Sequence, residues 1–254
     1  FDAEGVCSAC VNFHQRPHID WEQRKAELCK ILELEAATRN GSGFDCIVPS
    51  SGGKDSHYQV RTLIELGARP LVVTASTCYL TAIGRHNIDN LARHATTIEY
   101  TPNRTIRAKL NRLGLELVGD ISWPEHAAIF SIPFRVAANE GIPLVFYGEN
   151  PQREYGGPLG AEQAAQMTSR WRSEFGGFLG LRPNDFVGHA GITSKDMLDY
   201  QDYAFEGEQH FAAYFLGQFI PWDSHRNAET ARKAGMFYSG PPPCQASWWA
   251  FENL

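Results

Sequence analysis

The sequence PSSGGKDS at residues 49–56 decides the fold and is the most informative part of the chain. It follows a short apolar run and precedes a stretch with helical periodicity. Two adjacent glycines, Gly52 and Gly53, let the backbone approach a ligand closely and adopt positive φ. The amides at the start of the following helix then point at an anion, with hydroxyl groups and the ammonium group of Lys54 beside them. The stretch therefore predicts an anion-binding loop between a strand and a helix.

Short apolar strands alternate with helices around this loop. The sequence predicts strands at residues 44–49, 70–74, 97–101 and 143–147, and helices at residues 55–66, 84–94, 103–113 and 124–140. Because this alternation requires crossover connections, it predicts an α/β fold, a parallel sheet with helices on both faces. Ligands of such sheets bind beyond the carboxyl ends of the strands. We therefore expect a site in the segments that follow these strands.

The rest of the chain completes a three-part organisation. The predicted parts are an N-terminal segment with a helix at residues 1–43, the α/β domain at residues 44–157 and a helical cap over the sheet at residues 158–254. We expect residues 1–20 to be irregular and Asp20 to cap the helix that follows. The cap carries helical patterns at 161–175 and 225–234 and no strand–helix alternation. The chain begins with Phe1 rather than Met, and we expect the natural protein to extend beyond both ends.

Composition excludes several classes of protein. Hydrophobic residues make up 43% of the chain and charged residues 20%, which is typical of a globular protein and not of a disordered one. The net charge of −6 argues against nucleic acid as the main partner. No apolar run approaches the roughly 20 residues that span a membrane. Because the six cysteines form no disulfide framework and no signal segment is recognisable, a reducing, cytoplasmic location is expected.

The loop differs from one common phosphate-binding motif and resembles another. A Walker A loop needs a glycine separated by four residues from its Gly-Lys pair, with Ser or Thr after the lysine; here Val48 and Asp55 stand at those positions. The pattern Ser-Gly-Gly-x-Asp-Ser instead resembles the PP-loop of the ATP pyrophosphatases, which cleave ATP between the α- and β-phosphates. The alternative is an ordinary glycine-rich turn between a strand and a helix.

The PP-loop resemblance implies a role for each residue of the loop. Lys54 would carry charge toward the phosphates, and Asp55 would bind Mg²⁺. The implied binding site for the phosphates of ATP comprises Ser50, Ser51, Gly52, Gly53 and Ser56.

Further segments along the whole chain resemble the bacterial N-acetyl sugar amidotransferases of surface-polysaccharide and nonulosonic-acid synthesis. These segments are FDAEGVCSAC (1–10), DCIVPSSGGKDS (45–56), GRHNIDNL (84–91), TPN (101–103), PLVFYGENPQREYGG (143–157) and FIPWDSHRN (219–227). The resemblance implies that ATP activates the acetamido oxygen of a nucleotide-linked N-acetyl sugar. Ammonia then displaces AMP and leaves an acetamidino group. It also implies a separate glutaminase and a cyclase-like subunit as the source of ammonia. Whether the sugar is carried by UDP or by CMP stays open.

Several residues outside the loop are candidates for the site. Glu149, with Gly148 before it, follows the strand at 143–147 and could orient ammonia, take its proton or bind Mg²⁺; the alternative is a turn cap. Thr74 and Ser76 end the strand at 70–74, where the resemblance places adenine and ribose; a plain strand-end hydroxyl is equally expected. Arg85 and Asn87 lie at the start of the helix at 84–94 and are candidates for contact with the nucleotide or the sugar.

The remaining candidates have weaker support. Cys7 and Cys10 have the spacing of half a structural zinc site, which His14 or His18 could extend; the alternative is a reduced pair at the surface.

The aromatic residues of the last hundred positions, and the loop before them, favour structural roles. The segment Tyr155-Gly156-Gly157 has the pattern of a mobile loop that closes over the site, and Trp222-Asp223 could touch the acceptor sugar. A structural role is the better interpretation for these residues. The core or an interface is expected for Trp171, Trp248, Trp249 and Phe251.

Two other functions compete with the amidotransferase. A PP-loop enzyme that modifies tRNA, by sulfur transfer or lysidine-type ligation, shares the loop but predicts a basic face. A nucleotide-binding regulatory module without catalysis would have no need of Lys54, Asp55 and Glu149 together. The sequence therefore favours an ATP-dependent N-acetyl sugar amidotransferase that forms AMP and pyrophosphate.

Overall fold

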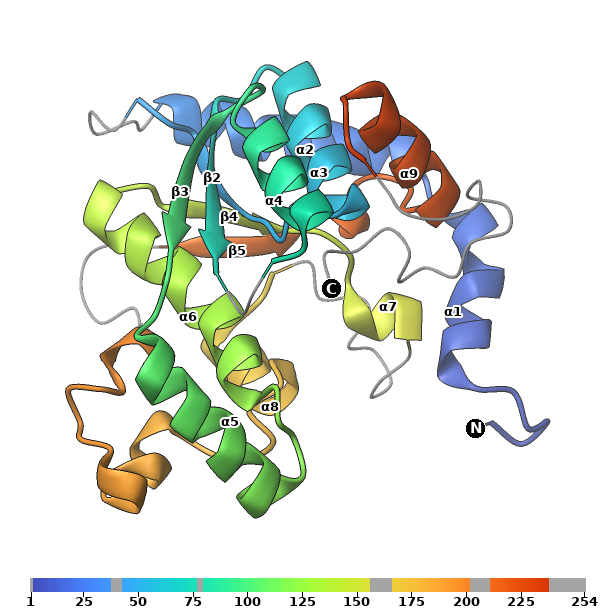
Figure 1. The fold of residues 1–254 in the computed structure, drawn as a ribbon. Coiled ribbons are helices and arrows are strands. Elements are labelled where there is room, and N and C mark those ends of the chain that lie inside the picture. The colour runs from blue at the N-terminus through green and yellow to red at the C-terminus, as the bar shows by residue number, and fades with distance from the viewer. Residues whose placement is uncertain (1, 38–42, 77–79, 156–165, 202–210, 238–254) are drawn as a thin grey trace.

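The computed structural model describes residues 2–37, 43–76, 80–155, 166–201 and 211–237 (Figure 1). Its strands are β1 (Cys46–Pro49), β2 (Pro70–Ala75), β3 (Thr96–Tyr100), β4 (Leu144–Tyr147) and β5 (Ala212–Phe215). Its α-helices are α1 (Ser8–Gln15), α2 (Trp21–Ala37), α3 (Lys54–Glu65), α4 (Ala82–Leu91), α5 (Arg104–Val118), α6 (Trp123–Glu140), α7 (Pro151–Tyr155), α8 (Ser169–Phe175) and α9 (Ser224–Lys233). Short 3₁₀ helices are η1 (Arg16–His18), η3 (Pro183–Phe186), η4 (His189–Gly191), η5 (Leu198–Tyr200) and η6 (Leu216–Gln218).

The five strands form one parallel sheet in the order β3-β2-β1-β4-β5. After β1 the chain adds β2 and β3 on one side, and then crosses to add β4 and β5 on the other. The strand order therefore reverses between β1 and β4, and this is where open α/β sheets bind ligands. The predicted α/β fold class is confirmed.

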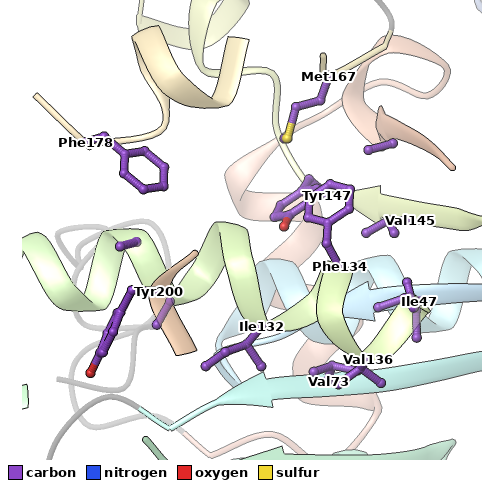
Figure 2. Close-up of a cluster of buried hydrophobic side chains, with 14 of the residues drawn as sticks. Ile47, Val73, Ile132, Phe134, Val136, Val145, Tyr147, Met167, Phe178 and Tyr200 are labelled. Atoms are coloured by element: carbon purple, nitrogen blue, oxygen red, sulfur yellow. The ribbon is translucent and has the colours of Figure 1, made fainter. Parts of the chain in front are cut away.

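Each face of the sheet has its own apolar core, because alternate residues of a strand point to opposite faces. Ile47 of β1 and Val73 of β2 pack with α5 and α6, and Figure 2 shows them in one cluster with Ile132 and Val136 of α6. Val48, one residue along from Ile47, packs on the opposite face with α2, α3 and α4. The near-continuous apolar strands in the sequence are thus explained by burial on both faces.

The chain begins with a helix where none was expected. Residues 1–20 were predicted to be irregular, and this is wrong because α1 occupies Ser8–Gln15. The Cys7 thiol caps it by accepting a hydrogen bond from the Cys10 N–H, with Sγ and N 3.5 Å apart. Cysteine is not among the residues that normally mark a helix start, so the usual signal was absent. The prediction that Asp20 caps the next helix is confirmed, since its Oδ1 accepts from the Gln23 N–H at 2.9 Å.

The last hundred residues contribute a strand to the sheet. No strand–helix alternation was expected after residue 158, and this is wrong, because β5 pairs in parallel with β4 from Leu144–Ala212 to Tyr147–Phe215. With four residues and a long connection before it, β5 carried too little pattern to be found. The helix predicted at 225–234 is confirmed as α9. The helix predicted at 161–175 is present as α8 in its last turns, and residues 161–165 lie outside the described residues.

The three-part division of the chain stays a prediction, although the sheet itself crosses the expected boundary at residues 157 and 158. Trp171 is buried in the core as expected, at 7% exposure, whereas Trp248, Trp249 and Phe251 lie outside the described residues. No helix in the described part of the chain is both long enough and apolar enough to cross a membrane.

Candidate functional site

The glycine-rich loop joins β1 to α3 as the sequence predicted. Gly52 has a φ of 82°, a conformation that favours glycine, and Gly53 is the N-cap residue of α3. The hydroxyls of the loop lie close to its amides: the Gly52 N–H donates to Ser50 Oγ at 3.1 Å, and the Ser51 N–H donates to Ser56 Oγ at 3.2 Å. Amide and hydroxyl groups therefore converge at the start of a twelve-residue helix, which is a suitable place for a phosphate group.

The loop borders a pocket of about 230 Å³ at the carboxyl ends of β1, β2 and β4. This pocket lies where the strand order reverses. It brings together residues predicted from three separate segments, namely Ser50, Ser51, Gly53, Lys54, Asp55, Ser56, Thr74, Ser76, Gly148 and Glu149. The order of the strands, rather than closeness in the sequence, assembles them.

Lys54 and Asp55 form an ion pair at the start of α3, with Nζ and Oδ2 2.5 Å apart. The Lys54 side chain is only 5% exposed, whereas that of Asp55 is 26% exposed. The other oxygen of Asp55, Oδ1, accepts a hydrogen bond from Nδ2 of Asn227 at 2.7 Å. One cation and one amide thus fix the orientation of the Asp55 carboxylate.

Glu149 supplies a second carboxylate directly after β4. Burial raises the pKa of Glu149, and the nearby charge of Asp55 raises it further, while Lys54 opposes the shift. The raised pKa of Glu149 beside a second carboxylate suits a bound divalent cation, because its positive charge would favour the ionised form of Glu149. The donor set also suits the metal, since Mg²⁺ takes oxygen ligands and few of them from the protein. Asp55 and Glu149 therefore fit a magnesium ion.

Part of the pocket lining is apolar. Leu80, Ile88, Ile129 and Pro133 line it together with Tyr147. Because Pro133 lacks an N–H, the carbonyl of Ile129 has no helical donor, and the Tyr147 hydroxyl donates to that carbonyl at 3.0 Å. This bond ties α6 to the end of β4, and these five side chains form an apolar wall of the pocket.

Thr74 and Ser76 line the same pocket from the end of β2, where the sequence placed them. Both are buried, at 4% and 8% exposure. The Ser76 backbone is held on both sides: its N–H donates to Tyr100 O at 2.8 Å, and its carbonyl accepts from Arg107 Nη1 at 3.2 Å. Their position beside the apolar wall is compatible with a nucleoside, and their role stays a prediction.

Arg85 is not brought into the pocket. It lies on α4 with its guanidinium paired to Asp89 and Glu99, each at 2.7 Å. Asn87, also weighed in the sequence, is buried and exchanges hydrogen bonds of 2.8 Å with the backbone of Phe237. The structure gives both residues structural partners, and a role for Arg85 in nucleotide binding gains no support.

Gly148 has a packing role that the sequence did not reveal. A Cβ atom built on Gly148 would lie 3.0 Å from Cη2 of Trp222, closer than ordinary contacts. The Trp222 ring in turn meets the Tyr58 ring edge-on, with centroids 5.4 Å apart. Asp223, the next residue, caps α9 by accepting from the Arg226 N–H at 2.8 Å. Trp222 and Asp223 thus have the structural roles that were the better interpretation.

The N-terminal cysteines lie on a helix that packs against the site from outside. Arg16, next to α1, forms an ion pair with Glu154 of α7 at 2.5 Å, and α7 directly follows Glu149 and Asn150. Within the described residues, no three potential metal ligands of the His, Cys, Asp or Glu type come together. Cys7 and Cys10 therefore gain no further zinc ligand among the described residues, and zinc stays a prediction. Tyr155 ends α7, and Gly156 and Gly157 lie outside the described residues.

A larger groove of about 580 Å³ lies on the outer side of α3, between α2 and α9. Tyr58, Arg61 and Glu65 line it, on the side of α3 that faces away from the loop. Since the groove contains none of the loop residues, it is not the candidate site. The volume of a cavity therefore does not identify the candidate site in this protein.

Asn227, which contacts the pocket residue Asp55, is a residue that sequence reasoning missed. It lies 172 residues from Asp55 and is fully buried, yet it contacts the carboxylate that the loop presents. It belongs to the segment FIPWDSHRN, which was noticed only for its resemblance. No spacing rule connects two residues so far apart, so the signal lay in the fold alone.

Comparisons with known proteins do not assign this chain to a family. Neither the protein-family models nor the curated proteins include a match to this chain. Among solved structures, the chain is similar to the NMN synthetase from Francisella tularensis. The two share 11% sequence identity and a TM-score of 0.39, over 88% of this chain and 99% of that one.

Proposed function

We propose that this chain is an ATP-dependent amidotransferase that cleaves ATP to AMP and pyrophosphate and converts the acetamido group of a nucleotide-linked N-acetyl sugar to an acetamidino group. One observation supports it above the others. The Ser-Gly-Gly-Lys-Asp-Ser loop and Glu149 lie in one pocket where the strand order reverses, next to an apolar wall. The resemblance of segments along the whole chain supports the choice of acceptor.

The loop binds and neutralises phosphate in this proposal. The amides at the start of α3 and the Lys54 ammonium group lie next to the β,γ-phosphates, where charge develops as pyrophosphate leaves. Asp55 and Glu149 would hold Mg²⁺, whose charge would offset the negative charge of the leaving pyrophosphate. The apolar wall with Thr74 and Ser76 accommodates the nucleoside.

The chemistry explains why ATP is needed. An amide oxygen is a poor leaving group, and its attack on the α-phosphorus of ATP, with release of pyrophosphate, turns it into part of a phosphate ester. Ammonia then adds to the former carbonyl carbon and loses a proton, and AMP leaves with the oxygen. That proton passes to solvent, because Glu149 is assigned to the cation in this proposal. The remaining contribution of the protein is to position the two reactants.

The decisive experiment measures pyrophosphate release and product mass together. The chain is incubated with ATP, Mg²⁺, ammonium and a panel of UDP- and CMP-linked N-acetyl sugars. The expected product carries NH in place of one oxygen atom and forms in equal amount with AMP. Pyrophosphate without this product would keep the ATP chemistry and reject the sugar, with RNA as the next acceptor to test. No pyrophosphate with any acceptor would favour a regulatory module.

The source of ammonia is tested in the same assay. We propose that a separate glutaminase and a cyclase-like subunit deliver ammonia to this chain. The chain alone is then expected to use ammonium and not glutamine, and to use glutamine once the glutaminase is added. Use of glutamine by the chain alone would contradict external delivery.

A further inference from the structure

Asn227 is a buried asparagine whose side chain has only its amide nitrogen hydrogen-bonded among the described residues. The residue is fully buried in the first turn of α9, and its Nδ2 donates to Asp55 Oδ1 at 2.7 Å. Its Oδ1 is also buried, and it has no hydrogen-bond partner among the described residues. A buried amide oxygen without a partner costs free energy, and a leucine of similar size would avoid this cost. The single contact with Asp55 is therefore the feature that accounts for an amide at this position.

The two partners of Asp55 differ in rigidity. Lys54 reaches Oδ2 through a long side chain with four rotatable bonds and can turn toward a phosphate group. Asn227 reaches Oδ1 through a short side chain on a capped helix, whose Asn227 N–H donates to the Asp223 carbonyl at 2.9 Å. Of the two, Asn227 is the partner that keeps the carboxylate in place when Lys54 moves.

We propose that Asn227 is a positioning residue that holds the Asp55 carboxylate in the orientation that binds the divalent cation of the nucleotide. This inference rests on the proposed function, because it assumes that Asp55 binds that cation. It makes α9 part of the phosphate site without any contact between α9 and the phosphates. A shift of α9 relative to α3 then changes the affinity for the cation.

The test compares Asn227 of α9 with Asn90 of α4, a second buried asparagine, which bonds to the end of α9. Asn227→Leu removes the bond to Asp55. Asn90→Leu is the matched control, because Asn90 is 3% exposed and donates to the Ala234 carbonyl, just after α9, at 2.8 Å. The readouts are Mn²⁺ binding to the chain by electron paramagnetic resonance, the Mg²⁺ concentration for half-maximal ATP binding, and the melting temperature.

Asn227→Leu is expected to raise both the Kd for Mn²⁺ and the half-maximal Mg²⁺ concentration by about tenfold, which equals the loss of about 1.4 kcal/mol. Asn90→Leu is expected to lower the melting temperature and to leave both metal readouts within about twofold of the wild type. Asn227→Leu with unchanged metal readouts would overturn the proposal, and so would a wild-type chain that binds no Mn²⁺. Normal metal and ATP binding without pyrophosphate release from any acceptor would contradict the proposed function alone.

Discussion

At the scale of single residues, the candidate site is a balance of charges within one pocket. The positive charge of Lys54 offsets the negative charge of Asp55 and opposes part of the rise in pKa that burial causes at Glu149. The two carboxylates come from different strand ends, so the fold brings like charges together at a cost in stability. Natural proteins keep such arrangements where function requires them. Two predictions follow from this balance.

Asp55→Ala is expected to lower the rate of pyrophosphate release at least about 100-fold, because the substitution removes an oxygen ligand of the metal at a site of developing charge. The circular dichroism spectrum should not change, since Asp55 is 26% exposed at the start of its helix. Glu65→Ala, at the other end of α3, serves as the control and should retain activity within about twofold. A normal rate for Asp55→Ala would refute the assignment of the loop.

Glu149→Gln is expected to be more stable than the wild type at neutral pH and less active. Burial raises the pKa of Glu149 in the folded protein, so its favourable contribution is lost as the pH rises through that pKa. The uncharged side chain of Glu149→Gln does not lose stability in this way as the pH rises. The difference in melting temperature should therefore vanish below about pH 4, where the carboxyl group is protonated in both states. Equal melting temperatures at pH 7.5 would contradict the burial of this charge.

At the scale of elements, the packing of neighbouring segments explains more than local propensity does. The end of β4 is held by two contacts. The Tyr147 hydroxyl bonds to the Ile129 carbonyl of α6, and Gly148 packs closely against the Trp222 ring. Both contacts join segments that are distant in the sequence. They fix the place where Glu149 leaves the strand, so the geometry of the site depends on them.

Gly148→Ala is expected to lower the free energy of unfolding by about 1–3 kcal/mol, because the added methyl group would lie 3.0 Å from the Trp222 ring and displace it. Gly217→Ala is the matched control, since a Cβ there meets its nearest neighbours at 3.5 Å, an ordinary contact. The control is expected to change stability by at most about 0.5 kcal/mol in urea unfolding. Equal effects of the two substitutions would count against the Trp222 contact.

Local signals in the sequence predicted most of the elements that surround the site. Four strands and the helices between them were found because apolar runs are local signals. The start of α2 was found in the same way from its cap, Asp20. The strand β5 and the contact between Asn227 and Asp55 depend on distant segments, and no pattern within one segment encodes them. Arg85 was predicted from its place at the start of a helix, yet Asp89 and Glu99 hold it elsewhere.

At the scale of the whole molecule, a buried histidine joins three elements. His57 Nδ1 lies 3.0 Å from the Gly53 carbonyl, and its Nε2 lies 3.1 Å from Nδ2 of Asn90, which also donates to the Ala234 carbonyl. The Gly53 carbonyl must accept and the Asn90 amide must donate. The ring is therefore neutral with its proton on Nδ1, and it ties α3 to α4 and to the end of α9.

The unfolding free energy is expected to rise with pH between about 4 and 6.5 because of His57. Burial lowers the pKa of His57 to about 4, below the usual 6.5, so the unfolded chain binds the extra proton in this window. The stabilising contribution of neutral His57 is present above about pH 6.5 and is lost as the pH falls toward 4. In His57→Gln, urea unfolding at several pH values should show a slope shallower by up to about 1.4 kcal/mol per pH unit. An unchanged slope would contradict a neutral, buried ring.

The place of β5 at the edge of the sheet has a consequence for how the protein is made. A ribosome releases β1 to β4 long before β5 and α9, and closing such long loops slows folding. The nascent chain therefore exposes the edge of β4, a surface prone to aggregation, until residues 212–215 emerge. Asp55 gains its partner on α9 only after that. Synthesis itself thus delays completion of the candidate site until the sheet is complete.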